Sequence, residues 1–207
     1  MTCARPPLGI LLLTVCGFST LYAPQPLLPV LAEAFGKGPT DASLLITLAM
    51  LPLAVAPLVY GYLLESVPAR PMLAGSALLL GLCQIGLALA DDWWLLLALR
   101  LLTGLCLPAL FTALMTFVAS SATTENLRQA LAWYIASTIL GGFSGRPLSG
   151  LVASVWDWRV ALGIWSPALL VMGLWALSLP GSQESRFLRV TPRVFLVVMA
   201  RPGTPQA

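Results

Sequence analysis

Two arginines stand inside long apolar stretches of the sequence, and these are the residues whose placement most suggests chemistry. Arg100 lies seven residues beyond Trp93, and Arg146 lies in a glycine-rich run. A charged side chain within a membrane span costs about 2.5 to 3.5 kcal/mol even on the lenient insertion scale, and such residues usually face a bundle interior or an aqueous cavity. We therefore take Arg100 and Arg146 as candidate substrate-binding residues. Snorkelling of each guanidinium group to the membrane surface is the alternative.

Residues for enzyme chemistry are missing from the chain. It contains no histidine, the usual general base and the commonest transition-metal ligand. Ser144 lies in a G-x-S-G pattern similar to that of six-span rhomboid proteases, but their serine is activated by a histidine. The four cysteines show no C-x-x-C spacing and fit small buried side chains. We expect no catalytic residue, no metal site and no cofactor, and we classify the chain as not an enzyme.

The elements that hold these arginines follow from composition. Of the 207 residues, 58% are hydrophobic and 9% are charged, whereas soluble domains carry about 25% charged residues. The chain is therefore predicted to be an integral membrane protein whose first partner is the lipid bilayer. A net charge of +3 over eleven basic residues offers no concentrated basic surface, which argues against nucleic-acid binding.

Six apolar runs, separated by short segments that hold most of the charges, predict an all-α polytopic membrane protein with six transmembrane helices. The predicted helices cover residues 8–32, 43–64, 71–90, 93–119, 129–154 and 160–180. Residues 1–180 would form one transmembrane domain, and residues 181–207 would form a cytoplasmic tail.

The basic residues predict the orientation. With the N-terminus inside, seven of them fall on the cytoplasmic side and two, Lys37 and Arg159, on the outer side. The positive-inside rule then places both termini in the cytoplasm.

An internal repeat relates the second and fifth runs at an offset of 89 residues. Gly61 aligns with Gly150, and Arg70 aligns with Arg159. The two aligned loops lie on opposite sides of the membrane, as in an inverted three-plus-three helix repeat of the kind found in transporters.

The loop after the second run carries a recognisable motif. It reads Gly61-Tyr-Leu-Leu-Glu65-Ser-Val-Pro-Ala-Arg70 and resembles the cytoplasmic signature G-x-L-x-D-R-x-G-R-R of the major facilitator superfamily. Glu65 stands for the acid and Arg70 for the last base, while Ser66, Pro68 and Ala69 depart from the pattern. The resemblance implies that Glu65 and Arg70 form a weakened loop latch with a role in conformational change. The alternative is that they form an exposed ion pair worth about 0 to 1 kcal/mol.

Two further runs resemble signatures of the same superfamily. Arg100 is followed four residues later by Gly104, like the intramembrane Arg and Gly of the fourth helix. The run Gly141-Gly-Phe-Ser-Gly145-Arg146-Pro-Leu-Ser-Gly150 is similar to the glycine-rich signature of drug–proton antiporters, with Arg146 where a proline usually stands. These glycines are candidates for a conformational motif, layered on simple helix packing.

The first run contains Tyr22-Ala-Pro-Gln25-Pro, which resembles the first helix of bacterial sugar-efflux and multidrug permeases and adds Tyr22 and Gln25 as candidate substrate-binding residues. Together the motifs are similar to the N-terminal six-helix half of a fold that normally has twelve helices. The resemblance implies secondary active transport or efflux of a small solute by alternating access in a bacterial inner membrane. Its partner would be a second six-helix half or a homodimer.

Two questions stay open at the level of sequence. No carboxylate lies deep in a run, and Glu33 is the nearest candidate for ion coupling; either the missing half supplies the coupling acid or coupling is absent. Arg100 either contacts an anionic or polar solute group or holds the first and fourth helices together. A truncated, non-transporting membrane fragment or scaffold is the alternative to a transporter.

Overall fold

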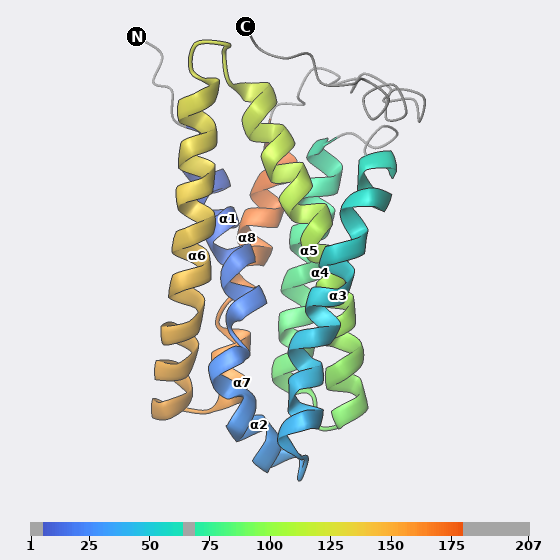
Figure 1. The fold of residues 1–207 in the computed structure, drawn as a ribbon. Helices are drawn as coiled ribbons and strands as arrows, with labels where there is room; N and C mark the ends of the chain where they lie inside the picture. Colours follow the sequence, from blue (N-terminus) through green and yellow to red (C-terminus); the bar gives the residue numbers. More distant parts are fainter. Residues whose placement is uncertain (1–5, 64–68, 180–207) are drawn as a thin grey trace, which may run out of the picture.

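The computed structural model describes residues 6–63 and 69–179, with only the backbone described for residues 56–63. These residues form long helices that run up and down a single bundle (Figure 1). Their bounds are α1 (Leu8–Tyr22), the 3-10 helix η1 (Gln25–Leu27), α2 (Leu28–Ala34), α3 (Pro39–Leu63), α4 (Ala69–Leu89), α5 (Trp93–Ser121), α6 (Leu127–Val155), α7 (Trp158–Gly163) and α8 (Ser166–Ser178). The predicted tail, residues 181–207, lies outside the described residues.

The first predicted helix is broken rather than continuous. α1 ends at Tyr22, and the chain resumes through η1 and α2. The cause is a run of prolines, because Pro24, Pro26 and Pro29 each lack the backbone N–H that would continue the ladder. The last predicted helix is broken in the same way into α7 and α8, with a proline in the first turn of α8. These breaks leave backbone carbonyls without helical donors near the ends of the short segments.

Polar side chains define where two of the helices begin. The carboxylate of Asp92 accepts a hydrogen bond from the Leu95 N–H at 3.0 Å and caps α5. Asp157 accepts from the Trp158 N–H at 2.6 Å at the start of α7. Both caps lie at the same end of the bundle (Figure 1), where short links join α4 to α5 and α6 to α7. An acid next to a helix N-terminus also meets the positive end of the helix dipole.

Four helical stretches in the described part of the chain are long and apolar enough to cross a membrane: Leu8–Ala34, Ala69–Leu89, Trp93–Ser121 and Trp158–Ser178. α3 and α6 fall outside this set. In α3 the apolar stretch with described side chains is Pro39–Val55, and the 29 residues of α6 include Arg128 and Arg146. The structure is therefore all-helical with four clear spans, and the predicted count of six remains a proposal.

The closest helix pairings are α1 with α6, α3 with α5, and α4 with both α5 and α8. Leucines from α4 and α5, such as Leu80 and Leu107, are completely buried at the centre of the larger core. A second core lies at the end where α2, α7 and the start of α5 meet, and there the Phe35 ring packs against Trp93 and Trp158. Two cores of buried apolar side chains therefore hold the helices of the bundle together.

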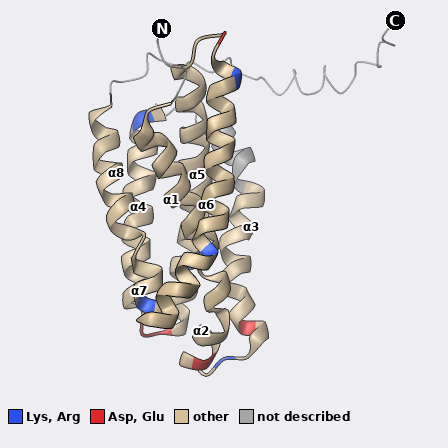
Figure 2. Ribbon diagram, turned by 90° about the vertical axis from the view of Figure 1, so that its left-hand side faces the viewer, with Lys and Arg blue, Asp and Glu red and all other residues tan. Residues whose placement is uncertain are grey.

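Charged residues are unevenly placed along the bundle. Figure 2 shows the acidic residues at the two ends, whereas basic residues also occur between the ends. The described acids are Glu33, Asp41, Asp91, Asp92, Glu125 and Asp157. The zone between the two ends, where a membrane would lie, therefore carries positive but no negative side chains among the described residues.

Candidate functional site

A polar cluster forms where α1 breaks against α6. The Nε of Arg146 donates a hydrogen bond to the Gln25 side-chain oxygen at 2.6 Å, and its Nη1 donates to the Gly142 carbonyl at 2.6 Å. The guanidinium carbon lies 4.0 Å from the centre of the Tyr22 ring. Tyr22 is the last residue of α1 and Gln25 the first of η1, so the proline break presents both side chains to α6. The structure thus brings together three of the four predicted binding residues.

The partners of Arg146 in this cluster are all neutral. They are an amide oxygen, a backbone carbonyl and an aromatic ring, whereas the one ion pair of the described chain joins Arg159 and Asp91 at 2.7 Å. Arg146 is also exposed at the surface of the bundle. The cluster therefore keeps a full positive charge that the described residues orient without neutralising.

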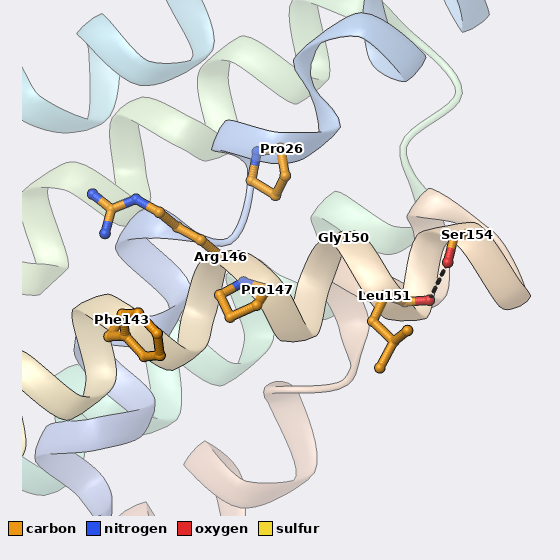
Figure 3. Close-up of a pocket in the computed structure, with 7 residues that line it drawn as sticks. All are labelled: Pro26, Phe143, Arg146, Pro147, Gly150, Leu151 and Ser154. Carbon is orange, nitrogen blue, oxygen red and sulfur yellow. Dashed lines mark hydrogen bonds between the residues drawn. The ribbon is translucent and has the colours of Figure 1, made fainter.

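An open pocket of about 620 Å³ borders this cluster on the face of α6. Its lining consists of Pro26, Phe143, Arg146, Pro147, Gly150, Leu151 and Ser154. In Figure 3 the Arg146 side chain leads away from Pro147 and Leu151, so its aliphatic stem lines the pocket and its guanidinium lies beyond it. The arrangement is an apolar surface with a cationic group at its margin.

Arg100 occupies a different environment from Arg146. Its side chain is 1% exposed and reaches from α5 to two other helices. Nε donates to the Leu45 carbonyl of α3 at 3.0 Å, while Nη1 and Nη2 donate to the carbonyls of Thr20 at 3.5 Å and Leu21 at 3.3 Å. These contacts correspond to the packing alternative for Arg100, extended from two helices to three.

The proline break explains why a carbonyl of α1 is available to Arg100. In an unbroken helix the Thr20 carbonyl would accept from the backbone N–H four residues later, but that residue is Pro24. The buried guanidinium supplies a donor in its place, since an unpaired buried carbonyl is costly. Arg100 therefore acts in this structure as a side-chain cap for α1.

Three of the predicted motif glycines lie where helix backbones touch. A Cβ on Gly104 would sit 2.6 Å from the Ala49 carbonyl oxygen of α3. On Gly141 and Gly145 it would sit 2.5 Å and 2.6 Å from the carbonyl oxygens of Val15 and Ser19 in α1. Such distances exclude any side chain without a shift of the backbone, so α5 meets α3 and α6 meets α1 through glycine.

The other motif residues are less constrained or are not described. A Cβ on Gly150 would make only an ordinary contact of 3.5 Å with Pro26. Gly61 lies within α3 and Arg70 within the first turn of α4. Glu65 lies outside the described residues, so the structure does not describe its geometry relative to Arg70.

Sequence reasoning missed two polar residues. Arg159 donates to the carbonyls of Ala88 and Ala90 at 3.1 Å each and pairs with Asp91, so it caps the C-terminal end of α4 from α7. Its alignment with Arg70 in the repeat was the available signal. Gln84 in α4 is completely buried, with no hydrogen-bond partner for either amide atom in the described structure; a lone glutamine in an apolar run was its signal. No three metal-ligating residues gather anywhere in the described ranges.

The all-helical bundle, with four stretches long and apolar enough to cross a membrane, defines the class of helical membrane proteins. Residues 10–201 match the family model described as "Major Facilitator Superfamily", and the chain belongs to this family. Its curated relatives include the inner membrane transport protein YnfM of Escherichia coli K12, 29% identical over 183 residues that cover 87% of this chain and 43% of YnfM. The uncharacterized MFS-type transporter YybF of Bacillus subtilis 168 is 30% identical over 81% of this chain and 42% of YybF.

A solved structure shows the same fold at low sequence identity. The peptide transporter POT (E310Q mutant), crystallised in complex with sulfate, superposes with a TM-score of 0.71 at 15% identity. The match covers 94% of this chain and 43% of the POT chain. The chain thus spans less than half the length of the relatives and of the solved structure that it matches.

Proposed function

We propose that this chain is one half of a transporter that carries out secondary active transport or efflux of a small solute across a bacterial inner membrane by alternating access. Family membership and the names of the transporter relatives support the general activity. The observation that carries the proposal at the level of residues is the charged cluster of Arg146, Gln25 and Tyr22 at a helix break between apolar helices. A scaffold without transport function gives no reason to place an uncompensated charge there.

In this proposal α3 and α6 also cross the membrane, which makes six spans. Their lengths of 25 and 29 residues exceed the approximately 20 residues that a span requires. The charge of Arg146 within α6 is accommodated because its guanidinium contacts Gln25 of η1 and the Tyr22 ring of α1 rather than lipid alone.

The bounds of the helices support an inverted three-plus-three repeat. Adding the 89-residue offset to the ends of α4, residues 69 and 89, gives residues 158 and 178, which are the first residue of α7 and the last of α8. The same offset carries α3 onto residues 128–152, within α6. The pairing of α1 with α6 then corresponds to the pairing of α5 with α3, and both pairings occur.

We assign substrate binding to Tyr22, Gln25 and Arg146, and we assign Arg100 to positioning the broken end of α1. The glycines of the conformational motif, Gly104, Gly141 and Gly145 above all, would let helices slide at close range during the change of access. Gly61 in α3 and Gly150 in α6 belong to the same conformational motif, and Glu65 and Arg70 would act as the latch between α3 and α4. The small solute lies between this half and a second six-helix half, supplied by another chain or by a homodimer.

The proposal predicts that two copies of this unit are needed for transport. Reconstitute the full chain in liposomes at densities from one copy to many copies per vesicle, and measure uptake of radiolabelled glucose, ethidium and phenylacetate. We expect uptake of at least one solute above protein-free vesicles, rising with the square of protein density at low occupancy. Full activity from single-copy vesicles would contradict the two-unit requirement, and no uptake of any solute at any density would contradict transport by a homodimer of this chain.

A further inference from the structure

The geometry points to an organic anion as the solute: we infer that the cluster around Arg146 selects a small carboxylate with an apolar body over its neutral and cationic counterparts. The inference rests on the proposed transport function and deepens it by naming the substrate class. It is carried by the placement of charge along the bundle and by the hydrogen bonds of Arg146.

Two guanidinium groups converge on the broken end of α1. Arg100 donates to the carbonyls of Thr20 and Leu21. The guanidinium of Arg146 stacks on the ring of Tyr22, the residue that follows Leu21. The C-terminal carbonyls of a helix carry partial negative charge, and Arg100 already uses this charge. The region around Arg146 therefore keeps a positive potential.

No described carboxylate between the ends of the bundle neutralises this positive potential. The acidic residues in the described ranges lie at the two ends (Figure 2), and Asp91 is committed to Arg159. Where water is excluded, electrostatic interactions strengthen as the effective dielectric constant falls. A solute that enters this zone as a cation meets like charge without a counter-ion, whereas an anion supplies the missing charge.

The hydrogen bonds of Arg146 leave donors free for such a solute. A guanidinium carries five N–H donors, and the described acceptors engage Nε and Nη1 through Gln25 and Gly142. No described residue accepts from Nη2. Because Gln25, Gly142 and the Tyr22 ring fix the plane of the group, the remaining donors are presented in a defined direction, as a carboxylate requires.

The apolar pocket beside the cluster suits the body of the solute. Phe143, Pro147 and Leu151 line it next to the stem of Arg146, and in Figure 3 the guanidinium lies beyond the Arg146 end of this surface, away from Leu151. A solute whose carboxylate reaches past its apolar body would contact both. Purely polar anions would use only the guanidinium and bind more weakly.

The experiment compares solutes that differ in charge alone. The purified full chain in dodecyl maltoside is dialysed to equilibrium against radiolabelled phenylacetate, phenylacetamide or phenethylammonium, and against butyrate, butyramide or butylammonium. We expect both carboxylates to bind, phenylacetate more tightly, and each to bind at least tenfold more tightly than its amide and ammonium counterparts.

Variants assign the selectivity to one side chain. Arg146→Gln is expected to weaken phenylacetate binding at least tenfold, and Arg146→Lys to weaken it less because the charge remains while the planar fork is lost. Arg128→Gln is the matched control, since Arg128 is exposed on the same helix 18 residues, or about five turns, away; binding should stay within twofold.

The outcomes separate this inference from the transport function. Equal or better binding of the ammonium or amide compounds, carboxylate binding insensitive to Arg146→Gln, or no carboxylate binding at all would overturn it. Retention of phosphatidylglycerol, dependent on Arg146 and without carboxylate binding, would overturn it in favour of a lipid headgroup. Uptake of ethidium or glucose by the vesicles with no carboxylate binding leaves transport standing, whereas carboxylate binding without any uptake leaves the anion site standing and transport by a homodimer of this chain refuted.

Discussion

Arg100 has no acidic partner among the described residues, and three backbone carbonyls take the place of one. Hydrogen bonds to a charged group contribute more than neutral ones, about 1.5 to 3 kcal/mol net. The side chain therefore ties α1, α3 and α5 together at a depth of about 10 Å from the start of α5, since it lies seven residues beyond Trp93. Its role in this fold is to hold helix ends in place.

Replacing Arg100 with Met keeps much of the apolar stem and removes the donors. We expect the free energy of unfolding to fall by about 1.5 to 3 kcal/mol, because the Thr20 carbonyl loses its substitute donor. Circular dichroism during titration with sodium dodecyl sulfate measures the change. Arg128→Met, on an exposed position, serves as the control and should have little effect. Equal unfolding of both variants would show that the carbonyl contacts contribute nothing.

The residue types at the candidate site could be predicted from sequence, but the different roles of Arg100 and Arg146 could not. The cost of burying charge identified both arginines. Which one is buried against carbonyls depends on where α1 breaks, and hence on the helix-terminating effect of Pro24 in three dimensions. The contact between Gln25 and Arg146 joins residues 121 positions apart, and no spacing rule in a single sequence reports it.

At the α3–α5 and α1–α6 crossings, glycines face backbone carbonyls of the partner helix. At the second crossing the Ser19 hydroxyl donates to the Gly141 carbonyl at 3.1 Å and lies 3.3 Å from the Ser144 hydroxyl. Close backbone approach and short polar contacts are the main attractive terms between helices in lipid. The crossing of α1 with α6 holds the elements that carry Tyr22, Gln25 and Arg146.

Adding a methyl group at a crossing tests this arrangement. Gly104→Ala and Gly145→Ala should each lower the free energy of unfolding by about 1 to 3 kcal/mol, because the new carbon would overlap a backbone carbonyl. Gly75→Ala is the control: its added carbon would meet nothing within 4 Å. That variant should be neutral or more stable by up to about 1 kcal/mol, since alanine favours the helix. The same detergent titration measures the free energy of unfolding of all three variants. An equal loss of stability in Gly75→Ala would refute the packing explanation.

The lengths of the apolar runs predicted where the helices lie, but they did not predict where a helix is interrupted. The run at residues 8–32 predicted one helix, and the structure breaks it at Tyr22. A proline is tolerated in some membrane helices, as Pro108 is within α5, so the residue type alone does not decide. The difference arises from number and neighbours: three prolines lie within six residues at the break, and a buried arginine is available to satisfy the freed carbonyl.

At the scale of the whole molecule, the described links between helices lie at both ends of the bundle (Figure 1). The link between α2 and α3 lies at the same end as the α4–α5 link, which contains Asp91, and the α6–α7 link, which contains Asp157; the link between α5 and α6 lies at the other end. In a membrane these links would therefore face opposite compartments.

Cysteine labelling tests the proposed orientation. Gly38→Cys and Thr123→Cys, both at exposed positions, are placed in a chain whose native cysteines are replaced by alanine. With the termini in the cytoplasm, an impermeant maleimide added to intact cells should label Gly38→Cys and not Thr123→Cys. Permeabilised cells, in which both variants should react, provide the control. The reverse pattern in intact cells would invert the topology.

The order of the residues around Arg100 has a consequence for biosynthesis. Its acceptors at Thr20, Leu21 and Leu45 precede it by 80, 79 and 55 residues. At roughly 5 to 20 residues per second of synthesis, α1 leaves the ribosome about 4 to 16 seconds before Arg100 does. The Thr20 carbonyl, which has no helical donor because of Pro24, is therefore synthesised before Arg100, its side-chain donor. When α5 enters the membrane, the carbonyls that accept from Arg100 are already present. The segment that carries the charge is thus inserted after the segments that solvate it.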